Sequence, residues 1–61
     1  MSLKELREKA GLKQAEVAKE LNVDQTAVSN WERGVNKPLK KYRPQLAGLY
    51  NCSEDDLLRG E

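Results

Sequence analysis

The stretch QAEVAKELNVDQTAVSNWERG, residues 14–34, decides the fold. Its apolar residues recur every three to four positions on both sides of a short break at residues 22–24, which is the period of an amphipathic helix. A three-residue break is too short for two helices to lie antiparallel, so the helices must cross steeply. The stretch therefore predicts a helix-turn-helix motif over residues 14–33, with its second helix at about 24–33.

This geometry makes demands at single positions, and the sequence meets them. The crossing needs a small side chain, which Ala18 supplies. The turn needs a residue that tolerates positive φ, for which Asn22 is the best choice after glycine. The next residue and one face of the second helix must be apolar, because they pack against the first helix. We expect the structural motif to consist of Ala18, Asn22, Val23, Val28, Trp31 and Gly34.

Helix start and stop signals divide the rest of the chain. Ser2 and Glu5 have the spacing of a capping box at the start of a first helix, and Gly11 suits the end of that helix. Pro44 suits the first turn of a later helix, and Ser53 suits the cap of a last short one. No alternation of apolar and polar residues indicates a strand. We therefore predict an all-α fold, a compact bundle of about five short helices, in a single domain over residues 1–61.

The composition excludes several classes of function. The 61 residues include one cysteine and no histidine, so they form neither an internal disulfide nor a cysteine–histidine metal site. No run approaches 18 apolar residues, and we expect a cytoplasmic protein that does not enter a membrane. The chain offers no nucleophile–base arrangement and little room for a water-excluding pocket of about 300 Å³. We therefore expect neither an enzyme nor a bound metal or cofactor.

Charge is distributed unevenly along the chain. Residues 1–52 hold ten Lys/Arg and six Asp/Glu, a net charge of +4, whereas residues 53–61 hold one Arg and four acids, a net charge of −3. Five basic residues and no acidic one lie within residues 33–43. A one-sided basic loop beside a helix is typical of a surface that binds a polyanion, and it is also compatible with a solvated loop.

Residues 14–34 and the closing sequence CSEDDLLRG, residues 52–60, together resemble the Cro/C1-type (phage repressor-like, XRE family) helix-turn-helix domains. The resemblance extends over nearly the whole chain and implies the lambda repressor-like fold. It also implies a sequence-specific transcriptional regulator from a bacterium or phage, whose second motif helix enters the major groove of double-stranded DNA. A homodimer formed through the C-terminal end of the chain is a further implication.

The resemblance assigns roles to polar residues, and helix geometry supports several of them. Outward positions on the second motif helix carry amides, which suit adenine N6 and N7, and a threonine, whose methyl group suits that of thymine. The expected base contacts are Gln25, Thr26, Ser29 and Asn30. The family places a glutamine against phosphate at the start of the first motif helix, where a helix N-terminus favours anions. The expected phosphate contacts are Gln14, Asn36, Lys37, Lys40 and Arg43.

Three positions depart from the family pattern. Lys13 replaces the usual Ser/Thr cap of the first motif helix, and Asn22 replaces the usual glycine. Asp24 replaces the common Ser/Thr before the second helix; we expect its carboxylate to cap that helix, although its charge opposes nearby phosphates. Trp31 is expected in the core instead of stacked on bases, and Cys52 is expected to be an inert core thiol.

A second interpretation is a protein-interaction module of the same fold, such as an antitoxin or a transcription adaptor. The near-neutral net charge of +1 and the acidic Asp24 favour it slightly. Glu32 and Arg33 pair either within the domain or with phosphate, and the sequence leaves both options open.

Overall fold

The computed structural model describes residues 2–59 and, within them, the side chains of residues 2–57. The helical elements, in chain order, are α1 (Leu3–Lys9), α2 (Gln14–Leu21), α3 (Gln25–Arg33), the 3-10 turn η1 (Lys40–Tyr42), α4 (Arg43–Tyr50) and α5 (Glu54–Arg59). The described residues contain no strand, and the predicted all-α bundle of about five short helices is confirmed. The segment expected to be a loop before α4 contains η1 in addition.

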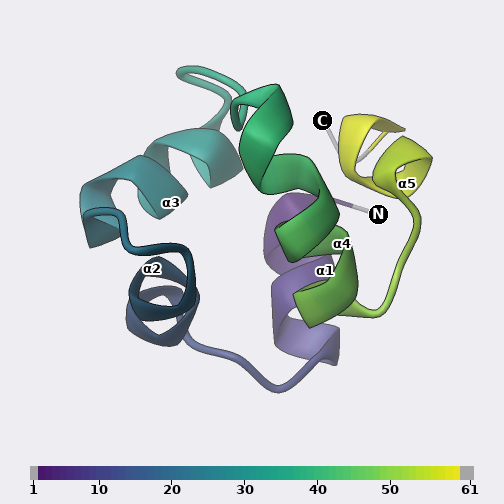
Figure 1. The fold of residues 1–61 in the computed structure, drawn as a ribbon, viewed down its shortest axis with the longest axis horizontal. Coiled ribbons are helices and arrows are strands. Elements are labelled where there is room, and N and C mark those ends of the chain that lie inside the picture. The colour runs from purple at the N-terminus through teal and green to yellow at the C-terminus, as the bar shows by residue number, and fades with distance from the viewer. Residues whose placement is uncertain (1, 60–61) are drawn as a thin grey trace.

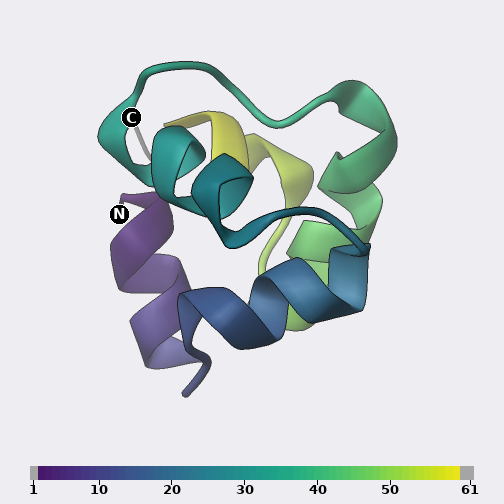
Figure 2. The same cartoon turned by 90° about the vertical axis from the view of Figure 1, so that its left-hand side faces the viewer.

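The helices surround a common centre. In Figure 1, α4 overlies α1 in the middle of the view, with α2 and α3 on one side and α5 on the other, and Figure 2 separates α1 and α4 to opposite sides of the picture. In the turned view of Figure 2, α2 runs across the picture while α3 is seen nearly end-on, so the two helices cross steeply, as predicted. The arrangement places α3 and the loop that follows it on the opposite side of the molecule from α5.

The core centres on the place where α2, α3 and α4 meet. Val17, Val28 and Leu46, one from each of these helices, are 0%, 1% and 1% exposed. The other buried apolar residues are Leu3, Leu6, Ala18, Leu21, Trp31, Tyr50 and Leu57. The apolar pair after the acidic residues of α5 predicts that Leu57 and Leu58 face the core. Leu57 is buried there, and the side chain of Leu58 lies outside the described residues.

Reciprocal hydrogen bonds close the first turns of the first and last helices. The Glu5 N–H donates to Ser2 Oγ at 3.1 Å, and the Ser2 N–H donates to the Glu5 carboxylate at 2.9 Å. The same exchange joins Ser53 and Asp56 at 3.1 and 3.2 Å. Hydrogen bonds from Ser2 to the ionised carboxylate lower the pKa of Glu5. The predicted capping box at Ser2 and the predicted cap at Ser53 are confirmed.

Residues with left-handed backbone end the helices. Gly11, Asn22 and Gly34 have φ angles of 76°, 58° and 77°, as the sequence predicts for each. The N–H of the residue after Asn22 donates back to the carbonyl of Ala18 at 3.0 Å, which closes α2 and turns the chain toward α3. Asn51, with a φ of 53°, ends α4 in the same way, a role that the sequence analysis did not anticipate.

The two motif helices begin with weaker caps. Asp24 has the extended backbone of an N-cap, with φ −71° and ψ 147°, but its carboxylate makes no capping hydrogen bond. The expectation that this carboxylate caps α3 is therefore wrong; the side chain is exposed, so water can satisfy it at little cost. Lys13 provides no side-chain cap for α2, although its N–H donates to the Glu16 carboxylate at 2.9 Å.

Candidate nucleic-acid interface

One side of α3 is fixed in the core by two apolar side chains. Val28 is 1% exposed and Trp31 is 8% exposed. The ring of Trp31 lies 5.8 Å from that of Tyr42 and is tilted by 41° to it, so η1 also packs against α3. Trp31 is therefore a core residue, as expected, and its ring is not available for stacking on bases.

The same side of α3 carries a buried ion pair. Arg7 Nε donates to Glu32 Oε2 at 2.6 Å, and a second guanidinium nitrogen lies 3.4 Å from Glu32 Oε1. The two side chains are 10% and 6% exposed, and Arg7 also donates to the carbonyl of Leu12 at 2.8 Å. The hydrogen bond to Glu32 raises the pKa of Arg7. Glu32 thus pairs within the fold, which resolves one of the options that the sequence left open.

Hydrogen bonds through two glutamines connect this ion pair to the surface of the protein. Gln14 Nε2 donates to Glu32 Oε1 at 3.0 Å, and Gln25 Nε2 donates to Gln14 Oε1 at a longer 3.4 Å. Hydrogen bonds therefore connect Arg7 of α1, Glu32 of α3, Gln14 of α2 and finally Gln25 at the start of α3. This chain of contacts limits the conformations of the Gln25 amide before any ligand binds.

Four of the residues assigned to DNA contact line one shallow depression of the surface: Gln14, Gln25, Thr26 and Ser29. Gln25 and Thr26 are exposed and Ser29 is half-buried. The structure thus brings together three of the four expected base contacts and one expected phosphate contact. Their hydroxyl and amide groups can donate and accept hydrogen bonds on a surface that a flat or convex partner can reach.

Asn30 lies beside this depression and lines a different, open groove. The guanidinium group of Arg33 donates a hydrogen bond to its side-chain oxygen. Arg33 therefore interacts within α3, and the Asn30 amide must exchange this partner if its oxygen is to accept a hydrogen bond from a base.

The basic loop carries the other residues assigned to phosphate contact. Asn36, Lys37 and Lys40 are exposed. Arg43 is half-buried, and its Nε donates to the carbonyl of Pro38 at 3.3 Å, so it also ties the loop to α4. Lys41, another basic residue of this segment, has its amino group 5.0 Å from the centre of the Tyr42 ring.

Arg7 is the residue of this region that the sequence analysis missed. A signal was present: Leu3, Leu6 and Ala10 form an apolar stripe, and Arg7 occupies the stripe position four residues after Leu3. A charged residue on a core-facing stripe of a small domain requires a buried partner. The sequence did not reveal that the partner is Glu32, because the two residues are 25 positions apart.

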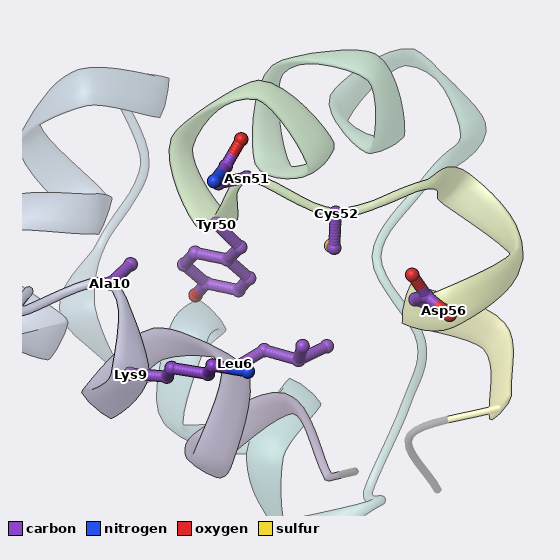
Figure 3. A pocket seen from close by; sticks show the side chains of 7 residues that line it. All are labelled: Leu6, Lys9, Ala10, Tyr50, Asn51, Cys52 and Asp56. Carbon is purple, nitrogen blue, oxygen red and sulfur yellow. The ribbon is translucent and has the colours of Figure 1, made fainter.

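A hollow of about 500 Å³ lies at the C-terminal end, between α1 and the α4–α5 connection (Figure 3). Leu6 and the ring of Tyr50 line it, with Lys9 on the α1 side and Asp56 on the α5 side. Burial raises the pKa of Tyr50 to about 12. Burial also raises the pKa of Cys52, which is half-buried and packs against the core. The thiol is therefore protonated near neutral pH, in agreement with the inert role expected for it.

Among the described residues, no three His, Cys, Asp or Glu side chains are placed to hold a metal ion together. Within the same part of the chain, none of the helices has the length and apolar character needed to span a membrane.

Comparison with known proteins identifies the family. A helix-turn-helix family model matches residues 3–57. The HTH-type transcriptional regulator ImmR of Bacillus subtilis (strain 168) is 45% identical to the chain over 56 residues. The match covers 92% of this chain and 44% of ImmR, so the chain spans less than half the length of that relative. No solved structure matches the chain. The family match and the steeply crossed α2–α3 pair together place the chain in the Cro/C1-type helix-turn-helix family.

Proposed function

We propose that the chain is a sequence-specific DNA-binding regulator of transcription that inserts α3 into the major groove of double-stranded DNA. The observation that carries the proposal is the division of α3 into two sides. Val28, Trp31 and Glu32 fix one side in the fold, while Gln25 and Thr26 are exposed on the other. A helix of this width fits the major groove, where each base pair presents a distinct set of donors and acceptors.

Gln25 and Thr26 are the leading candidates for base contact, and Ser29 and Asn30 are the next. A glutamine or asparagine amide can bond to adenine N6 and N7 together, and each such pair contributes about 1–3 kcal/mol of discrimination against a wrong base. Gln25 Nε2 also donates to Gln14 Oε1 at a long, solvent-exposed 3.4 Å, and this contact favours one orientation of the amide.

The phosphate contacts belong to the surfaces that flank α3. Gln14 lies at the N-terminus of α2, where unpaired N–H groups favour anions. Asn36, Lys37, Lys40 and Arg43 extend from the following loop and η1–α4 segment. Phosphate contacts position a protein on DNA without selecting a sequence, and they make affinity fall steeply with salt.

The proposal includes a homodimer in the bacterial or phage-infected cytoplasm. A single recognition helix reads only a few base pairs, and two copies on half-sites about 34 Å apart would read enough for useful specificity. The C-terminal end is the proposed contact, since α5 lies on the side of the molecule opposite α3 (Figure 1). The hollow there has Lys9 on one wall and Asp56 on the other, and a two-fold axis that sets Lys9 of one copy against Asp56 of the second would pair opposite charges twice.

Selection of binding sites from random double-stranded DNA tests the proposal. Selected and scrambled sequences are then compared by electrophoretic mobility shift at low and high salt. We expect one enriched motif, repeated at a spacing of about one helical turn, and binding that weakens as salt rises. Enrichment of no sequence and no shift at low salt would exclude the proposal.

The second candidate is a protein-interaction module, and one observation favours it. The carboxylate of Asp24 is exposed and makes no capping bond at the N-terminus of α3, which is where a phosphate would otherwise be attracted. If the protein binds no DNA at low salt, this module becomes the leading interpretation.

A further inference from the structure

Two large apolar side chains are exposed on the loop between α3 and η1. Val35 is 62% exposed and Leu39 is 61% exposed. Isolated apolar residues on a surface are common and require no special explanation. The position of Leu39 nevertheless distinguishes it from Val35.

Leu39 lines an open groove of about 510 Å³ between α3 and the loop, and Val35 is not among the residues that line it. Thr26, Ala27, Asn30 and Trp31 supply the α3 wall of this groove. The groove therefore contains two of the four side chains proposed to contact bases. A base pair that enters this groove to reach Asn30 therefore comes into the space that Leu39 also lines.

The groove combines groups that suit a base edge with groups that suit the flanking backbone. The Asn30 amide and apolar atoms of Ala27 and Leu39 can meet a base edge. Asn36 and Lys37, which also line the groove, are proposed to contact phosphate, and the Asp24 carboxylate repels phosphate at its other end. In the major groove, an A·T pair presents adenine N6 and N7 for an amide and the C5 methyl group of thymine for an apolar surface.

We propose that Leu39 is a specificity-determining residue whose side chain contacts the C5 methyl group of a thymine at or next to the base pair read by Asn30. The inference rests on the proposed DNA-binding function and deepens it, because it assigns base selection to a loop that otherwise carries phosphate contacts. The five basic residues at 33–43 favour the approach of this loop to DNA.

Replacement of thymine by deoxyuridine tests this contact, since uracil differs from thymine in lacking only the methyl group. Each thymine of the selected site is replaced in turn, and affinities are measured for the wild-type protein and for Leu39→Ala. For the wild-type protein we expect uracil to weaken binding about fourfold, the effect of one buried methyl group, at the thymine that Leu39 contacts in each half-site. Leu39→Ala should bind the thymine and uracil forms of that site equally. A thymine contacted by Thr26 would be a separate sensitive position and should keep its preference in Leu39→Ala.

Val35→Ala is the matched control, because it removes an equally exposed apolar side chain from the same loop but outside the groove. It should retain the preference for thymine. Both side chains are exposed, so neither variant is expected to disturb folding, which circular dichroism checks. Indifference of the wild-type protein to every uracil, or an unchanged preference at every sensitive thymine in Leu39→Ala, would overturn the inference and leave DNA binding intact. Failure to select any DNA would instead reject the proposed function, and the inference with it.

Discussion

The two sides of α3 differ in how their polar groups are satisfied. On the inner side, the Glu32 carboxylate receives hydrogen bonds from Arg7 and Gln14 and is almost completely buried. On the outer side, Asp24 and Thr26 are exposed, and the Asp24 carboxylate leaves the first turn of the helix uncapped. The inner side therefore determines whether α3 is held in place, while the outer side is free to determine what α3 binds.

One contact crosses between the two sides. Gln14 is hydrogen-bonded to Glu32 at 3.0 Å and to Gln25 at 3.4 Å. We therefore expect substitutions on the inner side of α3 to cause large losses of stability and substitutions on its outer side to cause small ones. Substitutions that disturb Gln14 should affect the contacts of both sides.

Glu32→Gln should produce the largest loss of stability. The substitution keeps the size of the side chain but leaves the Arg7 guanidinium buried without a counter-charge, which costs about 3–5 kcal/mol. Urea denaturation followed by circular dichroism measures the change. Glu20→Gln, an exposed position on α2, is the control and should change the free energy of unfolding by less than about 0.5 kcal/mol.

A cost that large could unfold a chain of 61 residues, so a second variant is needed. The double substitution Arg7→Met with Glu32→Leu removes both charges and should fold, with a stability close to that of the wild-type protein. A Glu32→Gln variant as stable as Glu20→Gln would show that the inner side does not depend on this pair.

Tyr50 of α4, whose hydroxyl group is affected by the charge of Glu32, makes the stability of the fold depend on pH. Burial, followed by the negative charge of Glu32, raises its pKa from near 10 in the unfolded chain to about 12 in the folded protein. The folded state holds the hydroxyl proton of Tyr50 more tightly than the unfolded chain does. The resulting stabilisation of the fold is complete below pH 10 and is lost as the pH rises from 10 to 12. The loss should be about 1–2 kcal/mol, since solvent partly screens the hydroxyl group.

Tyr50→Phe isolates this contribution from that of the lysines, which titrate in the same range. Unfolding free energies of both proteins are measured from pH 9 to pH 12, and only the wild-type curve should include the Tyr50 decrease. Parallel curves over that range would contradict the burial of the hydroxyl.

Asp24→Ser should have the smallest effect on stability and a clear effect on binding. Because the carboxylate makes no capping bond, its loss should change the free energy of unfolding by less than about 0.5 kcal/mol. Removal of a negative charge near phosphate should tighten DNA binding about two- to fivefold at low salt, and less at high salt. Glu20→Gln, at an exposed position near the C-terminal end of α2 and outside the proposed DNA and dimer contacts, is the control for net charge and should leave affinity nearly unchanged.

The sequence predicted those features of the fold that depend on local backbone rules. Asn22 and Gly34 end helices because few residues tolerate positive φ, and Ser2 begins one because its hydroxyl reaches the N–H of Glu5. The sequence did not predict features of the fold that depend on tertiary contacts or on the choice of side-chain conformation. The pairing of Arg7 with Glu32 requires α1 and α3 to be adjacent in space, which no local pattern encodes.

The candidate site could be predicted in part, because the helical period is also a local rule. The helical period places Gln25, Thr26 and Ser29 on one side of α3, and the structure finds them together around one depression. The period does not reveal that Asn30 is hydrogen-bonded to Arg33, or that the Asp24 carboxylate makes no capping hydrogen bond to its helix. Both depend on the choice of side-chain conformation.

We propose that the outer side of α3 selects DNA sequence while the neighbouring loop supplies general affinity. Parallel selection of binding sites with the wild-type protein, Gln25→Ala and Lys37→Ala tests it most directly. We predict that Gln25→Ala loses the preference at one base position of each half-site, whereas Lys37→Ala recovers the wild-type motif with lower affinity for every sequence. A Gln25→Ala motif identical to that of the wild-type protein, with affinity reduced equally for all sequences, would contradict the claim.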